Sequence, residues 1–112
     1  MIALKSYAGG NWKSGDGKER VLQHAVTGEE IATCSSEGLD FAAMLDWARS
    51  KGGPALRALT FHERAGLLKK MAGTLNEHLD EFHQIAAAYG ATRADAMMDV
   101  EGGIGTLGYY AS

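Results

Sequence analysis

The sequence is poor in the features that mark secreted or membrane-bound proteins. Its single cysteine, Cys34, cannot form an internal disulfide, which is typical of a protein from a reducing compartment. No apolar run approaches the roughly 18 residues needed to span a bilayer, and the apolar start at 1–5 is too short for a signal peptide. We therefore expect a cytoplasmic protein that does not bind membranes.

Basic charge is also scarce. The chain has 11 Lys and Arg against 14 Asp and Glu, a formal net charge of −3, so it offers no electrostatic footprint for nucleic acid or anionic lipid. The one basic cluster, Arg64 with Lys69 and Lys70, is better explained as the solvated face of a helix. With 46% hydrophobic and 22% charged residues, the composition is that of an ordinary globular domain, so disorder is not expected.

Short β-prone runs separated by glycine turns open the chain. We predict two or three antiparallel strands, a β arm over residues 4–33. Such a small sheet is marginal in water and leaves strand edges unpaired, so the arm should lie against something larger. The runs are Lys5–Tyr7, Arg20–His24 and Ile31–Thr33, and the turns are Gly9-Gly10, Gly15-Asp-Gly17 and Thr27-Gly28.

From Ser36 onward the hydrophobic period changes to that of helices. Gly52-Gly53-Pro54 should end the first helix, Thr60 with Glu63 should form a capping box at the start of the second, and Gly90 should be a left-handed C-cap. The sequence thus predicts a mainly α-helical cluster beside the β arm. Apolar residues three and four apart place the helices at about 39–51, 60–75, 77–89 and 93–110.

The last predicted helix is unusually rich in glycine. Gly102, Gly103, Gly105 and Gly108 each cost roughly 1 kcal/mol relative to alanine, about 4 kcal/mol together, so local propensity alone would not hold this helix. Three of them recur at intervals of three residues and leave a strip without side chains, which could admit another backbone or a bulky ligand. We expect this helix to be covered by polypeptide outside the 112 residues.

Two short patterns match enzyme motifs in residue type but lack the context that the chemistry needs. Gly103–Gly108 satisfies G-x-G-x-x-G, but the dinucleotide fingerprint needs a strand before it and an acidic residue about 20 positions later. Cys34 follows the strand-like run Ile31–Thr33 and would need a base or a positive environment to act as a nucleophile. A helix glycine cluster and a structural cysteine are the favoured interpretations, so no catalytic or cofactor-binding residue is predicted.

Metal-binding patterns also fail. His62-Glu63 begins like H-E-x-x-H, but Gly66 stands where the second histidine is needed. His78 and His83 should point about 140° apart on a helix, which favours surface histidines over a shared metal. Asp80 and His83 could face each other, yet a bundle metal site needs several such pairs. No metal ligand is predicted.

Four blocks of the sequence resemble, in order and spacing, the N-terminal part of aldehyde dehydrogenases. They match the family's glycine-tryptophan strand, its "N-P-A-T-G-E-x-I-A" hairpin, its "E-R-x-x-x-L" helix, and a "D-V" turn followed by a helix with a Tyr-Tyr-Ala ending. The chain departs from the family at His24-Ala25, which replaces Asn-Pro, and at Tyr89-Gly90-Ala91, which replaces Thr-Gly-Lys. The blocks are Tyr7–Trp12, His24–Ala32, Thr60–Met71, and Asp99-Val100 with Tyr109-Tyr110-Ala111.

A narrower resemblance covers nearly the whole chain. Lys51–Arg64, Gly90–Asp95 and Asp99–Leu107 are similar to the branch of the family in which an aldehyde dehydrogenase is fused to an enoyl-CoA-hydratase-like, oxepin-CoA hydrolase domain and acts in phenylacetate degradation. The resemblance implies an α/β parent fold, an NAD- or NADP-dependent, homo-oligomeric oxidoreductase, and a CoA-linked semialdehyde substrate. Residues 1–112 would be the N-terminal part of its NAD(P)-binding domain.

The resemblance also implies what the chain does not contain. The family's catalytic cysteine, glutamate base, asparagine oxyanion donor and nucleotide site all lie beyond the matched residues. We therefore expect the chain alone to bind neither NAD nor NADP and to be inactive, with the remainder of the parent polypeptide as its partner. The choice between NAD and NADP, the exact aldehyde, the oligomeric state and the origin of the truncation stay open.

Aligning the Tyr-Tyr-Ala ending with the family places Met98 and Gly102 one turn apart, on the helix face that lines the substrate tunnel of aldehyde dehydrogenases. A bulkier residue often occupies the second position. We hypothesise that Gly102 widens the tunnel for a semialdehyde carrying a CoA thioester and that Met98 supplies an adaptable apolar wall. The alternative is that both residues merely pack in the core.

A second function, of a non-enzymatic class, stays open. The chain could be a small non-enzymatic helical module whose glycine strip and β arm mediate self-association or binding of a partner. A self-sufficient module should unfold cooperatively by itself, whereas a piece of an enzyme should expose apolar surface and aggregate or oligomerise.

Overall fold

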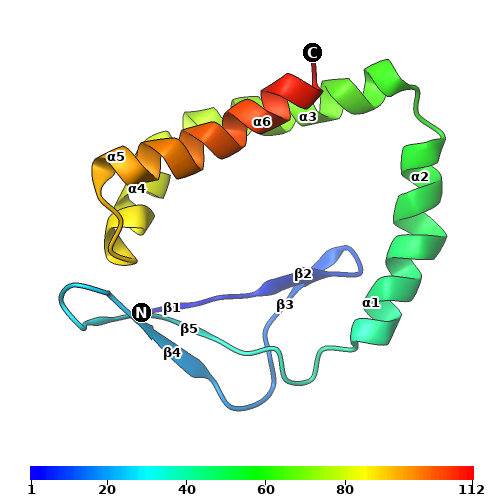
Figure 1. Cartoon of the computed structure of the whole chain (residues 1–112). Helices are drawn as coiled ribbons and strands as arrows, with labels where there is room; N and C mark the ends of the chain where they lie inside the picture. The colour runs from blue at the N-terminus through cyan, green and yellow to red at the C-terminus, as the bar shows by residue number, and fades with distance from the viewer. The chain divides into compact units, whose positions relative to one another are not determined.

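The computed structural model describes all 112 residues, which form two compact units, Met1–Arg57 and Ala58–Ser112 (Figure 1). The first unit has two small sheets, β1-β5-β4 and β2-β3, followed by a helical segment. The second unit is entirely helical. The strands are β1 (Ile2–Ala3), β2 (Ser6–Ala8), β3 (Asn11–Lys13), β4 (Arg20–Gln23) and β5 (Glu30–Cys34).

The two-stranded sheet is a tight antiparallel hairpin. Gly9 and Gly10, with φ of 58° and 82°, form its turn, which needs the positive φ that glycine adopts without strain. Tyr7 lies opposite Trp12, and the two rings meet edge to face with centroids 5.2 Å apart. The predicted Gly9-Gly10 turn is confirmed, but β3 lies outside the predicted β-prone runs, and the structure has five short strands where two or three were predicted.

The three-stranded sheet corrects the prediction of a purely antiparallel arm. β4 and β5 pair antiparallel, but β1 pairs parallel with β5, with Ile2 opposite Ala32. Parallel partners need a long connection, and the intervening hairpin and β4 supply it, so β1 joins the free edge of β5. The sheets span residues 2–34, slightly more than the predicted arm.

The first helical segment does not end at Gly52–Pro54, so that prediction is wrong. It runs through α1 (Phe41–Trp47), the π-turn η1 (Ala48–Gly52) and α2 (Gly53–Arg57). In a regular α-helix the ring of Pro54 would clash with the carbonyl four residues earlier. The wider π-turn, in which Gly53 N–H donates to the carbonyl of Ala48, accommodates the proline instead.

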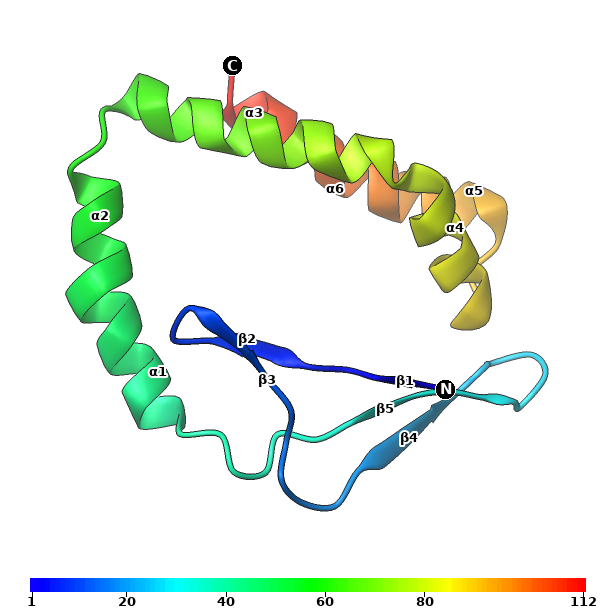
Figure 2. The same cartoon turned by 180° about the vertical axis from the view of Figure 1, so that it is seen from behind.

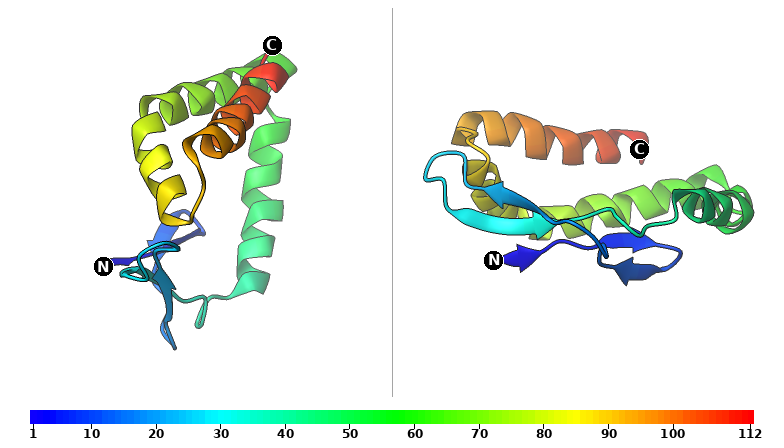
Figure 3. Two further views of the ribbon diagram at one scale, coloured as in Figure 1. Left: turned by 60° about the vertical axis from the view of Figure 1, so that its left-hand side comes forward. Right: turned by 90° about the horizontal axis from the view of Figure 1, so that it is seen from below.

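The second unit has three helical stretches close to those predicted. α3 (Phe61–Glu77) is followed by α4 (Leu79–Ala88), and then a continuous helix comprises α5 (Arg93–Ala96), the π-turn η2 (Met97–Glu101) and α6 (Gly102–Tyr110). α6 runs antiparallel to α3 and packs against it, and α5 contacts α4 (Figures 1, 2 and 3). None of the helices is both long and apolar enough to cross a bilayer.

The capping box predicted at the start of α3 is confirmed. Glu63 Oε2 accepts from the Thr60 backbone N–H at 2.7 Å, and Thr60 Oγ1 accepts from the Glu63 backbone N–H at 3.2 Å. The Thr60 backbone N–H, together with its hydroxyl, lowers the pKa of Glu63 from its ordinary value of 4.5. The ionised carboxylate is therefore part of the cap.

The left-handed C-cap predicted at Gly90 is also confirmed. Gly90 has a φ of 92°, and its N–H donates to the carbonyl of Ala87 at 3.1 Å. Ala91 N–H donates to the carbonyl of Ala86 at 3.0 Å. These two bonds form a Schellman motif, which ends α4 and turns the chain toward α5.

The buried core is thin. No large side chain is completely buried. The chain exposes 8593 Å², whereas two compact proteins of half its mass would together expose about 7,200 Å². The helices therefore leave apolar faces uncovered within these residues. The buried apolar residues are Ala8, Ala32, Ala72, Ala86, Ala96 and Ile104.

Replacement of Gly90 by alanine should destabilise the second unit by roughly 1–2 kcal/mol, because the left-handed φ is strained for an L side chain. Gly73→Ala is the matched control: Gly73 lies inside α3 with no atom within 4 Å of the added Cβ, so alanine should stabilise by up to about 1 kcal/mol. Urea unfolding followed by circular dichroism measures both. Equal stability of the two variants would contradict the Schellman motif.

Acidification should fray the start of α3. Because the folded pKa of Glu63 is lowered, its stabilisation is complete above the ordinary value of 4.5 and is lost as the pH falls through the lowered pKa. Glu63→Gln should remove this acid-dependent loss of helicity, as measured by circular dichroism from pH 7 to pH 2. Glu77→Gln, at the other end of α3, is the control and should retain it.

Candidate functional site

The two residues predicted to line a substrate tunnel lie where the π-turn η2 passes into α6. Met98 belongs to η2 and is 77% exposed, and Gly102 is the first residue of α6. A Cβ added to Gly102 would meet no atom within 4 Å. Neither residue packs in a core within this chain, and their place in a tunnel stays a prediction.

The glycine strip is open along its length. Added Cβ atoms at Gly102, Gly105 and Gly108 would all meet nothing within 4 Å, so α3 does not use the strip for close packing. α6 contacts α3 instead through a face that includes buried Ile104. The strip is therefore available to a segment or ligand that is not part of these residues.

The structure also shows where the motif-like glycines, the cysteine and the histidines lie. Gly103–Gly108 lies within α6, so the strand that a dinucleotide fingerprint needs before it is absent. Cys34 ends β5 as a half-buried free thiol and makes no hydrogen bond. No group of three or more potential ligands gathers to hold a metal ion. His78, the N-cap residue of α4, instead pairs with Glu81 in the first turn of that helix at 2.7 Å, and this partner raises the pKa of the imidazole.

His83 is not the surface residue that its spacing predicts. Its side chain is only 15% exposed, because α4 packs against η2, and its Nε2 lies 3.2 Å from Glu101 Oε1. A carboxylate can only accept, so the neutral imidazole must carry its proton on Nε2. The other nitrogen, Nδ1, is then a buried acceptor without a partner in the protein.

A second contact joins α4 to the same π-turn. The Tyr89 hydroxyl donates to Asp99 Oδ2 at 3.4 Å. Partial burial and the Asp99 carboxylate together raise the pKa of Tyr89 from its ordinary value of 10.0. Two carboxylates of η2, two residues apart, thus hold this stretch of the helix to α4.

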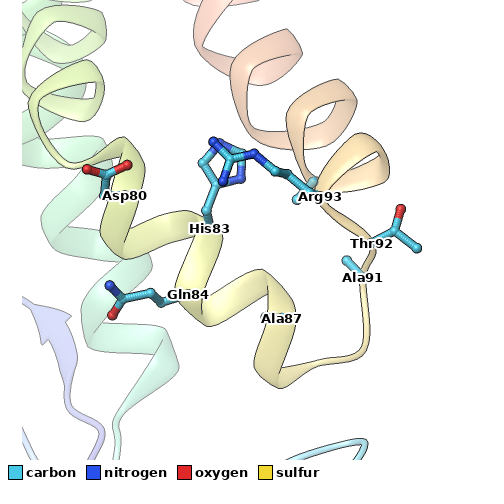
Figure 4. A pocket seen from close by; sticks show the side chains of 8 residues that line it. Asp80, His83, Gln84, Ala87, Ala91, Thr92 and Arg93 are labelled. Carbon is cyan, nitrogen blue, oxygen red and sulfur yellow. The ribbon is translucent and has the colours of Figure 1, made fainter.

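A pocket of about 410 Å³ lies beside these contacts, between α4 and α5 (Figure 4). His83 extends into it from α4 and Arg93 from the start of α5 (Figure 4). Arg93 makes no ion pair within the chain. The pocket therefore offers one guanidinium without an ion-pair partner, beside an imidazole that Glu101 already engages. Its lining residues are Asp80, His83, Gln84, Ala87, Ala91, Thr92, Arg93 and Ala96.

The first unit has a smaller pocket of about 280 Å³, where the β2–β3 hairpin meets α1. Trp47 and Met44 of α1 line it together with Lys13 of β3 and Asp40. Asp40 is already engaged as the N-cap of α1, accepting from the Ala43 N–H at 2.9 Å. This pocket therefore offers packing space rather than a cluster of reactive groups.

Known proteins resemble this chain over most of its length. The aldehyde dehydrogenase family matches residues 12–112. A 3,4-dehydroadipyl-CoA semialdehyde dehydrogenase from Aromatoleum evansii is 42% identical over 111 residues, which cover 98% of this chain and 22% of that protein. The chain thus spans about a fifth of that relative's length. The resemblance noted in the sequence is confirmed, and the chain belongs to the aldehyde dehydrogenase family.

Proposed function

We propose that this chain is the N-terminal segment of an NAD- or NADP-dependent aldehyde dehydrogenase that oxidises a CoA-linked semialdehyde in the degradation of phenylacetate or a related aromatic compound. The observation that carries the proposal is the 42% identity, over nearly the whole chain, to a protein named for a CoA-linked semialdehyde. A cytoplasmic location and fusion to a hydratase-like domain belong to the same proposal.

In this proposal the nicotinamide cofactor accepts the hydride of the aldehyde, and residues outside this chain bind it. The only glycine pattern of the nucleotide type lies within α6, where a helix offers its glycines no phosphate cradle. The contribution of these 112 residues is therefore structural. They supply helices that support the nucleotide domain and one wall of the substrate passage.

The uncovered apolar surface supports a larger protein around this chain. The exposed area exceeds that of two compact units of the same total mass, and large apolar side chains such as Phe61 and Ile85 are exposed on α3 and α4. The remainder of the parent polypeptide, in a homo-oligomer, would cover these faces. Burial of each such side chain would contribute about 1.5–3 kcal/mol.

Met98 and Gly102 are the residues we assign to the passage. The thioether side chain of Met98 is flexible and apolar, and the missing side chain of Gly102 leaves room one turn later. A CoA-linked semialdehyde is far bulkier than a simple aldehyde, so an open position at this point would favour it.

Gly102→Leu in the full-length enzyme should raise KM for a CoA-linked semialdehyde about tenfold or more while sparing a short aliphatic aldehyde, because the leucine fills space that only the large substrate needs. Gly103→Leu is the matched control, since Gly103 is equally open but points about 100° away from Gly102 on the same helix. Steady-state kinetics with both substrates measure the effect. Equal loss for both substrates, or the same selectivity in the control, would count against the assignment.

The alternative is a non-enzymatic helical interaction or oligomerisation module, and the isolated 112-residue chain distinguishes the two. We expect the chain alone to bind a hydrophobic dye and to form oligomers or aggregates in sedimentation experiments, because its apolar faces are uncovered. It should also lack dehydrogenase activity, because the family resemblance places the catalytic and nucleotide-binding residues outside this chain. A compact monomer with a sharp cooperative thermal transition would favour the independent module.

A further inference from the structure

We propose that His83 is a positioning residue that, through Glu101, fixes the π-turn η2 and thereby sets where Met98 and Gly102 stand in the substrate passage. The inference rests on the proposed function for the identity of the passage. The hydrogen bond itself and the shape of the helix are properties of the second unit alone.

The π-turn decides which face of the last helix meets its neighbours. Ala96 and Ile104, on either side of the turn, are both buried although they are eight residues apart. On a regular α-helix they would point about 80° apart, whereas one extra residue in the turn brings them to within about 20°. Both residues can therefore face the side of the helix on which α3 and α4 lie. There α5, which carries Ala96, packs against α4, and α6, which carries Ile104, packs against α3.

The same rotation sets the direction of Gly102. If η2 relaxed into a regular α-helix, every residue after it would turn by about 100° relative to those before it. Relative to α4 and α5, Gly102 would then point about 100° away from its present direction, or Ile104 would turn away from α3. An isolated π-turn is less stable than an α-helical turn, so other contacts must hold it.

Only two side-chain hydrogen bonds hold η2 to α4, and the one from His83 is the better placed. It is 3.2 Å long and its imidazole is mostly buried, whereas the Tyr89–Asp99 bond is 3.4 Å long and comes from a tyrosine that is 55% exposed. Glu101 is the last residue of the π-turn and directly precedes Gly102. A substitution of His83 should therefore change the position of Gly102 first.

The test uses the full-length enzyme and four variants: His83→Ala, His83→Gln, Glu101→Ala and the double His83→Ala/Glu101→Ala. We expect His83→Ala to raise KM for a CoA-linked semialdehyde about fivefold, a change equivalent to losing one ordinary hydrogen bond, while kcat for a short aldehyde is unchanged. Amide hydrogen exchange over 97–102 should accelerate. Glutamine can donate to Glu101, so His83→Gln should restore most of both properties.

A thermodynamic cycle separates positioning from general damage. If His83 acts through Glu101, the double variant should be no worse than either single variant. His78→Ala is the matched control: it removes a shorter bond, from the N-cap residue of α4 to Glu81 in the first turn of that helix, and this bond involves no residue of η2, so kinetics and exchange should stay those of the wild type.

Three results would overturn the proposal. The first is an equal loss for both aldehydes without faster exchange over 97–102, which a merely structural role predicts. The second is additive damage in the double variant. The third is faster exchange in His83→Ala with no change in substrate selectivity. If the wild-type enzyme oxidises neither aldehyde, the proposed function fails separately, and the exchange and rescue measurements alone decide whether His83 fixes the turn.

Discussion

The second unit depends on one helix presenting the same side to two neighbours. Ile104 must reach α3 while Ala96 reaches α4, and both are buried in the structure. On a regular helix these two residues would point about 80° apart, and the π-turn η2 reduces that difference to about 20°. Glu101 and Asp99 of that turn hydrogen-bond to His83 of α4 and to Tyr89 directly after it, and in our proposal the His83 bond sets the direction of Met98 and Gly102.

The glycines of α6 leave an open face on this helix. They lower the intrinsic stability of the helix, and no part of the chain exploits the space that they leave. The chain belongs to the aldehyde dehydrogenase family and matches about a fifth of a relative's length. This is consistent with the unused space beside the glycines. The open glycine face and the thin core both agree with the proposal that residues outside this chain cover these helices.

Local features were the most predictable from sequence. The capping box of Thr60 with Glu63 and the Schellman motif at Gly90 each depend on residues within a few positions of one another, so their spacing in the sequence already defines their geometry. The Gly9-Gly10 turn is of the same kind. The family, too, was recognised from short blocks in a fixed order, since each block keeps its residues regardless of how the chain packs.

The sequence by itself determined the mainly helical content, the start of α3, the end of α4, and the family. Only the tertiary structure decided three other features. They are the parallel pairing of β1 with β5, the passage of the first helical segment through Pro54, and the burial of His83 against Glu101. The strand pairing and the histidine contact join residues far apart in the chain, which the spacing of apolar residues along one helix or strand cannot predict. The proline is accommodated by a π-turn, which that spacing does not predict either.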